Sequence, residues 1–519
     1  MSVIKSNYPL TAGIHPADNK VQSASAALQY CPMPKQLLLP LNMHAGAAAK
    51  AIVNIGDSVY KGQCIAEAEN GISAFIHSPV VGQISDIRSM PVANRSGLEE
   101  TVIVIDCQQQ QPNSYHEMLE WSKQSAEQLL ETIKLAGVVG LGGAGFPSHH
   151  KIISGRKSIH TLLLNGAECE PYISCDDRTM RDYSAQILEG ALILSRVLGC
   201  SKIQIAIEDN KPQAIAAISR AVELFDKHST QFEVLQIPTC YPSGGERQLI
   251  EIVTGKQVPS GGFPSALGYN VQNIGTALAV YDALVLDKPL IDRIVTVTGD
   301  SVSRPGNYRV AFGTPIRHLL EFAGWDEAKS HLLIHGGPMM GFPLPDADRP
   351  ISKISNCIIA GSIEEFPEPE PERACIRCGQ CADVCPASLL PQQLLWFSKS
   401  GEIDKAKDIR LLDCIECGAC AYVCPSQIPL VDYYRFSKAE LRNKAAAKIK
   451  SEQSKQRFDF RNQRLEQQEM EIQRKRKAKA RLIAEKNLKG DGMDAKKQLV
   501  ADALARVQAK KDAKDKTDV

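Results

Sequence analysis

The spacing of hydrophobic and polar positions changes several times along the 519 residues, which predicts several domains rather than one. Residues 1–34 show no periodicity and are expected to form an extended lead-in. Residues 35–107 contain short apolar runs separated by turn pairs with Gly or Pro, the pattern of a compact all-β unit. From residue 125 to residue 285, helical periodicity alternates with buried-strand runs, which predicts an α/β domain.

Three further segments follow the α/β domain. Residues 288–340 combine a strand, a Pro-Gly turn and a helix, which predicts a small α+β module. Residues 366–434 begin with a stiff, acidic, proline-rich linker and contain cysteine runs separated by predicted helices. Residues 437–519 are polar, and we expect either a long helix interrupted at Gly490-Asp491-Gly492 or a solvated, disordered tail.

A glycine-rich loop opens the α/β domain and is followed by polar residues at the end of a predicted strand. Its glycines are Gly140, Gly142, Gly143 and Gly145. Such a loop permits positive φ and lets backbone N–H groups approach a phosphate or a flavin ring, although many glycine-rich turns bind nothing. The predicted strand 160–164 leads to Asn165, Glu168 and Glu170 at its carboxyl end, where open α/β sheets usually bind ligands.

Two cysteine runs carry the most specific signal in the chain. Each reads C-x2-C-x2-C-x3-C-P, which places three thiolates on one tight loop around an iron–sulfur cube. In two-cluster ferredoxins the last Cys of each run ligates the other cluster. We therefore expect two [4Fe–4S] clusters, one held by Cys375, Cys378, Cys381 and Cys424 and the other by Cys414, Cys417, Cys420 and Cys385.

Other uses of eight clustered cysteines fit the pattern less well. Disulfide-dense domains are small and secreted, and zinc knuckles use four ligands arranged in pairs. Gly379 and Gly418 lie inside the two loops, where the absence of Cβ lets backbone N–H groups approach the cluster sulfurs. The remaining eight cysteines are scattered and are expected to be ordinary thiols.

Composition and charge restrict the setting. We see no export signal at the N-terminus and no apolar run long enough to span a membrane, so a protein of the reducing cytoplasm is expected. Residues 436–519 contain 24 Lys and Arg against 13 Asp and Glu, although the whole chain carries a net charge of only +1. This basic tail could bind an anionic membrane surface or nucleic acid, or remain solvated.

Residues 35–107 resemble the biotinyl/lipoyl-type barrel sandwich, on the wording Val-Asn-Ile-Gly-Asp-Ser-Val at 53–59 and Ser-Pro-Val-Val-Gly-Gln-Ile at 78–84. In that family a Lys at the hairpin tip carries a swinging cofactor. Here the tip is Glu69-Asn70-Gly71-Ile72-Ser73, without a Lys, so a structural or docking role is expected.

Residues 125–285 are similar to the flavin-bearing NADH-oxidising subunit of respiratory complex I. The resemblance rests on the glycine loop, Asn165 to Tyr172, Tyr241 to Glu246 and Tyr269 to Thr276. It implies a Rossmann-like α/β domain that binds FMN and NADH. The implied contacts are Gly140, Gly142, Gly143, Gly145 and Lys151 to FMN phosphate and ring; Asn165 and Glu168 to the flavin; Glu170, Tyr241 and Glu246 around the nicotinamide; and Asn273 and Thr276 on the flavin phosphate side. Gly244 is a further implied cofactor-binding residue.

Several positions depart from that family's pattern. Leu141 replaces an Arg, Ala167 an Asp, Gly245 a Glu and Gln272 an Asn, so the details of nicotinamide binding are left open. Single residues also have structural alternatives. Glu168 and Glu170 could cap helices, and Lys151 could be a solvated charge.

The remaining modules complete one larger resemblance. Residues 288–340 resemble the soluble-ligand-binding β-grasp domain, and residues 366–434 resemble a helical two-cluster ferredoxin. Their order, up to about residue 436, resembles the C subunit of the Rnf-type ion-translocating electron transport complex. The resemblance implies a peripheral subunit on the cytoplasmic face of the inner membrane, docked on integral membrane subunits. It implies electron transfer between NADH and an acceptor such as ferredoxin through FMN and two [4Fe–4S] clusters, with no nucleic acid expected.

Two other functions stay open from sequence alone. One is an electron-carrying docking subunit that has kept the fold and lost the flavin. The other is a soluble NADH-linked hydrogenase or formate dehydrogenase subunit, which shares the flavin and β-grasp modules but is disfavoured by the barrel sandwich.

Overall fold

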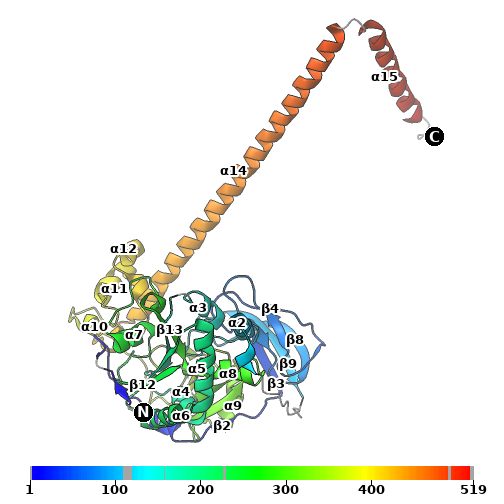
Figure 1. Cartoon of the computed structure of the whole chain (residues 1–519). Coiled ribbons are helices and arrows are strands. Elements are labelled where there is room, and N and C mark those ends of the chain that lie inside the picture. Colours follow the sequence, from blue (N-terminus) through cyan, green and yellow to red (C-terminus); the bar gives the residue numbers. More distant parts are fainter. Residues whose placement is uncertain are drawn as a thin grey trace. The chain divides into compact units, whose positions relative to one another are not determined.

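The computed structural model describes residues 3–6, 8–108, 120–156, 158–225, 230–488 and 492–514. Two compact units divide the chain, Met1–Lys438 and Ala439–Val519. The first unit contains four β-sheets and the cysteine runs (Figure 1). The described part of the second unit is helical, formed by α14 (Leu430–Leu488) beyond Lys438 and by α15 (Gly492–Lys514). Of the predicted helix interruption, Gly490 and Asp491 lie outside the described residues.

A five-stranded parallel sheet organises residues 125–285, where the alternating pattern predicts an α/β domain. Its strand order is β1 (Ile4–Lys5), β12 (Gln231–Ile237), β11 (Lys202–Glu208), β10 (Thr161–Gly166) and β13 (Tyr269–Asn273). Side chains alternate between the two faces of each strand, so both faces are apolar and both are covered. Leu162 and Leu164 pack in one core with α5 and α8, whereas Leu163 packs in another with α7.

The helices around this sheet begin and end where local sequence signals place them. These are α2 (Ala126–Leu135), α3 (Ser148–Ile153), α4 (Cys175–Asp182), α5 (Ser184–Leu198), α6 (Pro212–Leu224), α7 (Glu246–Thr254) and α8 (Ile274–Val285). Ser125 and Gln128 form a capping box at the start of α2, and Gly199 ends α5 at a φ of 74°. Figure 1 shows α5 and α8 next to one another, in agreement with their packing contact.

Two small sheets form the barrel sandwich. One has the order β3 (Gln36–Pro40), β9 (Glu99–Cys107), β8 (Gly82–Pro91) and β5 (Ser58–Val59), and the other β4 (Lys50–Ala51), β6 (Cys64–Glu67) and β7 (Ile76–His77). Their buried side chains join the core of the α/β domain in one apolar cluster. The sandwich is therefore packed firmly on the α/β domain.

A six-stranded mixed sheet follows, in the order β17 (Phe342–Leu344), β16 (Leu332–His335), β18 (Cys357–Gly361), β14 (Asp292–Thr298), β15 (Gly306–Ala311) and β2 (Gln29–Tyr30), with α9 (Ile316–Phe322). Strand β2 at the edge of this sheet and strand β1 at the edge of the parallel sheet both come from residues 1–34, which were expected to form only an extended lead-in. This segment, which includes α1 (Val21–Ala24), pairs with β12 and with β15 and so joins the two domains.

The two cysteine runs have the same local geometry. Each loop contains two residues with positive φ, Arg377 and Gly379 in the first run, Glu416 and Gly418 in the second. A four-residue helix follows each loop, α10 (Gln380–Asp383) and α13 (Ala419–Tyr422). Between the runs lie α11 (Pro391–Lys399), α12 (Ile403–Asp408) and a 3₁₀ turn at Leu411–Asp413. Of the two helices predicted there, 391–400 is confirmed and 402–412 is shorter than predicted.

Candidate functional site

Four segments expected to surround a flavin meet at the carboxyl edge of the parallel sheet. Asn165 at the end of β10 lies beside Asn273 at the end of β13 in the strand register. The Asn165 amide donates to the Gly244 carbonyl over 2.9 Å. The backbone N–H of Leu141, in the glycine loop, donates to the Thr276 hydroxyl over 3.0 Å. The sheet therefore brings together residues that are 79 to 135 positions apart in the sequence.

The glycine loop packs directly on the N-terminal end of α8. A Cβ built on Gly142 would lie 3.4 Å from the Cβ of Asn273, and Gly275 lies next to Leu141. Asn273 caps α8 by accepting the N–H of Gly275 over 2.8 Å. The N-terminal end of α8 and the glycine loop therefore lie against one another, and a glycine loop beside a helix N-terminus is an arrangement that binds phosphate.

The glycines of the loop have different surroundings. At Gly143, with a φ of 117°, an added Cβ would meet no atom within 4 Å. At Gly145, with a φ of 62°, an added Cβ would lie 2.6 Å from Ile354, and its carbonyl accepts the N–H of Ala45 over 2.9 Å. Gly143 thus leaves open space beside the backbone, as a flavin cradle requires, while Gly145 permits close packing on the barrel sandwich.

Lys151 and Glu246 form an ion pair. Lys151 is on α3 and Glu246 is the first residue of α7, and their Nζ and Oε2 atoms are 2.6 Å apart. Both side chains are partly exposed, so the pair contributes little to stability. Lys151 is therefore a paired charge that is only partly solvated.

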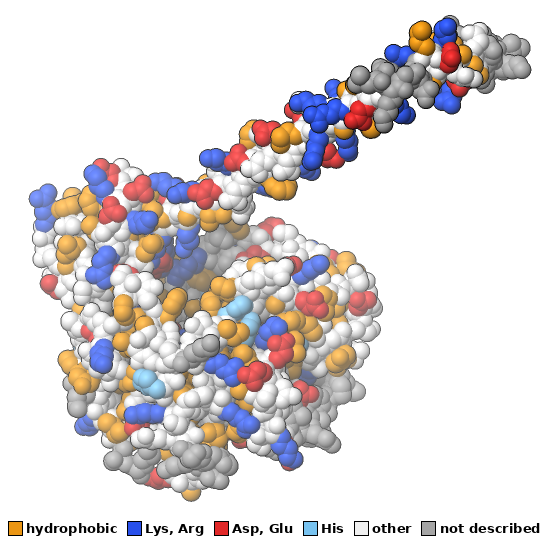
Figure 2. Space-filling view, turned by 45° about the horizontal axis from the view of Figure 1, so that its top comes forward, with side chains coloured by type: hydrophobic (Ala, Val, Ile, Leu, Met, Phe, Trp, Pro, Cys, Tyr) orange, Lys and Arg blue, Asp and Glu red, His pale blue; other side chains and the backbone are white. Residues whose placement is uncertain are grey.

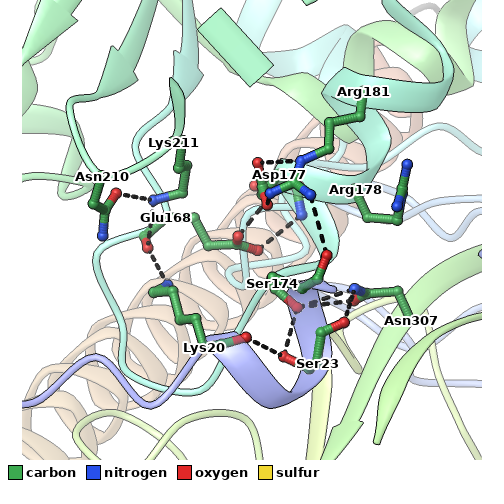
Figure 3. A network of polar contacts seen from close by, with 12 residues as sticks. Lys20, Ser23, Glu168, Ser174, Asp177, Arg178, Arg181, Asn210, Lys211 and Asn307 are labelled. Carbon is green, nitrogen blue, oxygen red and sulfur yellow. Dashed lines mark hydrogen bonds and ion pairs between the residues drawn. The ribbon is translucent and has the colours of Figure 1, made fainter. Parts of the chain in front are cut away.

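Glu168 caps a helix, which is the structural alternative considered for it. One carboxylate oxygen accepts the N–H of Asp176 over 2.8 Å and the other accepts that of Asp177 over 3.3 Å, at the first turn of α4. Figure 3 shows Lys20 and Lys211 directed at the same residue, and both amines donate to its backbone carbonyl. Glu168 therefore fixes α4 against the end of β10.

Asp176 is a partly buried residue that the sequence did not single out. Its carboxylate accepts the Asn273 amide over 2.6 Å and lies close to Glu168 and Cys175, with ligand atoms of the three within 4.8 Å of one another. Burial, and then the charge of Glu168, raise the pKa of Asp176 to about 7. The positive charge of the buried Arg293 opposes this rise only in part, and the Arg293 guanidinium donates to the Leu141 carbonyl over 3.1 Å. An acidic residue in a polar run gives no sequence signal for such a position.

Glu170 binds a loop of the six-stranded sheet domain. Its Oε1 atom accepts the backbone N–H groups of Met339 and Met340 over 2.7 and 2.8 Å. A Cβ on Gly337 would overlap the Glu170 side chain at 2.0 Å, which explains a glycine there. Burial raises the pKa of Glu170, and the two N–H groups oppose this rise. The structure thus places Glu170 between two domains.

Tyr241 points to the second cysteine run. Its ring is 1% exposed and its hydroxyl donates to the carbonyl of Cys417 over 2.5 Å. Gly244, three residues later, donates its N–H to the thiol of Cys169 over 3.2 Å. Residues 241–246 therefore contact both the segment that holds Cys169 and the second cysteine run, a position that the sequence could not reveal.

The departures from the flavin-domain pattern also have structural surroundings. Leu141 and Ala167 are buried, and Gln272 is buried with its amide donating to Asn270 over 2.9 Å. A Cβ on Gly245 would lie 2.4 Å from the flexible end of Gln248. Three of the four replacements therefore belong to the protein interior, and Gly245 forms the N-cap position of α7.

The eight cysteines of the two runs line two cavities. One, of about 150 Å³, is lined by Cys375, Cys378, Cys381 and Cys424 together with Trp396 and Gln392. The other, of about 20 Å³, is lined by Cys385, Cys414, Cys417 and Cys420 together with Pro391 and Tyr434. We name these the outer and the inner centre. Each centre combines three cysteines of one run with the fourth of the other run, which is the grouping that cross-ligation requires.

The thiols of the two centres suit bound iron. Cys378 of the outer centre is exposed, whereas Cys417 and Cys420 of the inner centre are buried. Burial raises the pKa of Cys417 to about 12 and that of Cys420 further, so bare thiolates are unfavourable there. Iron compensates the charge of four thiolates, which fits this donor set.

Four known families match separate parts of the chain. The RnfC barrel sandwich hybrid domain matches residues 9–110, the Nuo51 FMN-binding domain residues 133–282, the SLBB domain residues 294–343 and the 4Fe-4S dicluster domain residues 374–428. Their order along the chain is the order of the domains in the structure.

Similar proteins cover nearly the whole chain. The C subunit of the ion-translocating oxidoreductase complex of Salmonella enteritidis PT4 (strain P125109) is 45% identical over 506 residues, which are 97% of this chain and 70% of that protein. The protein of the same name from Klebsiella pneumoniae (strain 342) is 47% identical, over 89% of this chain and 61% of its own length.

Among solved structures, an NAD+-reducing [NiFe]-hydrogenase in the air-oxidized state aligns with a TM-score of 0.44 and 18% identity, covering 58% of this chain and 61% of that chain.

A membrane-spanning helix needs a long apolar stretch. Within the part of the chain that the structure describes, no helix is both long enough and apolar enough to cross a membrane.

Proposed function

This chain belongs to the family of C subunits of ion-translocating oxidoreductase complexes, and on this premise we propose that it transfers electrons between a nicotinamide nucleotide and the other subunits. Its cofactors are FMN and two [4Fe–4S] clusters. Electron transfer through such a complex is coupled to ion translocation, as the family name states.

One observation carries the proposal. The flavin-type segments and both four-cysteine centres lie in one compact unit, and Tyr241 of the flavin segment touches Cys417 of the inner centre. When bound, FMN accepts two electrons as hydride and releases them singly, whereas an iron–sulfur cluster accepts one. A chain with both kinds of site close together can therefore connect a two-electron donor to one-electron acceptors.

The chain's own residues would hold and orient the flavin. The N–H groups around Gly140, Gly142 and Gly143, the N-terminus of α8 and the amine of Lys151 would bind its phosphate and ring. Asn165 and Asn273, at the ends of β10 and β13, and Thr276, in the first turn of α8, would close the flavin site. Gly244 and Glu246 would border the nicotinamide, while Glu168, Glu170 and Gly145 would act by fixing α4, the 336–341 loop and the sandwich.

The eight cysteines would ligate the clusters in the grouping of the two cavities. Cys375, Cys378, Cys381 and Cys424 would hold the outer cluster, and Cys385, Cys414, Cys417 and Cys420 the inner one. No side chain need act as nucleophile or general base, since hydride and electrons are the only species transferred.

The finer fold assignments follow from the same premise. We assign residues 35–107 to a lipoyl-like barrel sandwich without a carrier lysine, 125–285 to a Rossmann-like FMN domain, 288–340 to a β-grasp module, 366–434 to a helical ferredoxin and 437–519 to a basic tail. The sheets and helices described above support this division.

The proposed setting is the cytoplasmic face of the inner membrane, with integral subunits of the same complex as partners. A soluble ferredoxin is the proposed exchange partner beyond the complex. The tail would bind anionic lipid, since its described Lys and Arg side chains beyond Lys438 are exposed, and Figure 2 shows several of them along it.

Purification of the full chain without oxygen tests the function. We expect FMN to be released on denaturation, about eight iron atoms per chain, and loss of flavin absorbance when NADH is added. Iron without flavin, and no response to NADH, would instead identify an electron-carrying docking subunit. Recovery in a soluble complex with hydrogenase or formate dehydrogenase activity would identify the third alternative.

A further inference from the structure

The contact between the flavin segment and the inner centre is small, buried and built around one tyrosine. Ile14, Tyr241, Cys417 and Ala419 are buried in a single apolar cluster, with Met339 packed against it. The cluster therefore joins three parts of the chain: the lead-in segment, the flavin domain and the second cysteine run.

Hydrogen bonds fix the Cys417–Gly418 peptide from one side. The Tyr241 hydroxyl donates to the Cys417 carbonyl over 2.5 Å. Because a trans peptide is planar, holding this carbonyl toward Tyr241 directs the N–H of Gly418 to the opposite side. Gly418 lines the inner cavity, so the orientation of its N–H bears on the sulfurs held there.

A second contact supports the same turn. A Cβ on Gly418 would lie 3.0 Å from the carbonyl oxygen of Met339, so the two backbones are in close contact. Glu170 holds Met339 and Met340 by their N–H groups, and its carboxylate also faces the Tyr241 hydroxyl. Tyr241 and Glu170 thus constrain the inner centre from two directions.

The outer centre has no such constraint among the described residues. Every residue that lines its cavity lies between Cys375 and Leu430. Its Cys378 is exposed, and Arg377 lies over the partly exposed ring of Trp396 at 5.5 Å. The flavin domain therefore touches one centre and leaves the other facing solvent.

We infer that Tyr241 is a positioning residue for the inner centre, and that this centre is the one that exchanges electrons directly with the flavin domain. The inference rests on the proposed function for the direction of exchange. The role of Tyr241 in setting the environment of the inner cluster stands without it. Hydrogen bonding and burial around a cluster set its reduction potential, so the tyrosine hydroxyl contributes to that of the inner cluster alone.

Tyr241→Phe tests this role, because it removes only the hydroxyl. We expect iron and FMN content to stay unchanged and the equilibrium constant for reducing the inner cluster to fall about two- to tenfold, the effect of one net hydrogen bond. The outer cluster should keep its potential. The measurement is a dithionite titration followed by electron paramagnetic resonance, with the outer signal assigned by its loss in Cys375→Ser.

Tyr308→Phe is the matched control, since Tyr308 is also buried and its hydroxyl donates to the Arg304 carbonyl, in the six-stranded sheet domain. Both potentials should be unchanged in it. If Tyr241→Phe loses the iron of the inner cluster, the variant Glu170→Gln is measured instead. It is expected to shift the reduction potential of the inner cluster alone. Unchanged potentials, or a shift confined to the outer cluster, would overturn the inference. Dithionite needs no flavin, so this result is independent of whether NADH is the donor.

Discussion

At the scale of single residues, Glu168 illustrates how a residue can shape a site through its neighbours. The flavin resemblance implies a direct contact with the flavin, whereas the structure directs its carboxylate at the first N–H groups of α4. Helix α4 carries Asp176, which binds Asn273. The carboxylate is therefore linked to the pocket through two further side chains.

Glu168→Ala is expected to lower the free energy of unfolding by about 1–3 kcal/mol, because it leaves buried N–H groups of α4 without an acceptor. Urea unfolding followed by circular dichroism measures this change. Glu246→Ala, which breaks a partly exposed ion pair, should cost less than about 1 kcal/mol. Equal losses in the two variants would argue against the capping role.

Cys417→Ala should remove one cluster and keep the other. We expect the iron content to fall from about eight to about four atoms per chain, since a cluster left with three thiolates is open to oxidation and loss. Iron analysis of protein prepared without oxygen measures it. Cys357→Ala, which alters a buried thiol outside both cavities, should keep all the iron. Unchanged iron in Cys417→Ala would exclude Cys417 as a ligand.

At the scale of secondary structure elements, the predictable part of the fold is the part with local signals. Periodicity predicts helices over residues 126–135 and 184–198, and α2 and α5 have these bounds, because a capping box, an apolar periodicity and a terminal glycine lie within or beside their own sequence. Strands β1 and β2 have two residues each, too few to show a period. They exist because β12 and β15, far along the chain, offer free edges.

The same distinction holds for the site. The glycine loop and the cysteine runs can be recognised in the sequence because binding a phosphate or an iron–sulfur cluster requires these residues at this spacing. The positions of Glu170 and Tyr241 depend on how the flavin domain meets the 336–341 loop and the second cysteine run. Such contacts between domains leave no pattern in either segment.

Lys353 connects three domains and gives the fold a dependence on pH. Its side chain is 0% exposed, and its amine donates to the carbonyls of Phe75 and Gly137 over 2.7 Å each. Burial lowers the pKa of Lys353 from 10.5 to about 7. The folded state therefore binds the proton of Lys353 more weakly than the unfolded state does. The contribution of Lys353 to the free energy of unfolding is complete above pH 10.5 and is lost as the pH falls through about 7.

We expect stability to rise between pH 7 and pH 9 in the wild type by more than in Lys353→Met. The difference between the two proteins should approach about 1.4 kcal/mol per pH unit at most. Urea unfolding at the two pH values measures it. Lys405→Met changes an exposed lysine paired with Glu402 and should keep the wild-type dependence. An identical pH dependence in Lys353→Met would show that the buried amine does not titrate in this range.

At the scale of the whole molecule, the charge is divided between the two compact units. Residues 439–519 contain 23 Lys and Arg against 13 Asp and Glu. Lys438, just before them, pairs with Glu416 and donates to the Cys414 carbonyl, so it belongs with the inner centre. A deletion that begins at Ala439 therefore removes the basic tail and keeps this contact.

Deletion of residues 439–519 should weaken binding to vesicles that contain anionic lipid and leave the iron content unchanged. The loss should be largest at low salt, because each Lys or Arg near the surface contributes about 1 kcal/mol and salt screens it. Vesicle sedimentation at two salt concentrations measures it, with neutral vesicles as the control. Equal binding of the deleted and full chains to anionic vesicles would contradict a membrane role for the tail.

The central claim is that electrons from a two-electron donor reach both iron–sulfur centres within this one chain. The most direct measurement is electron paramagnetic resonance of the full chain, prepared without oxygen with FMN bound, before and after NADH is added. We expect NADH to produce the signals of two reduced clusters. If FMN and about eight iron atoms are present and dithionite reduces both clusters but NADH reduces neither, the claim is wrong.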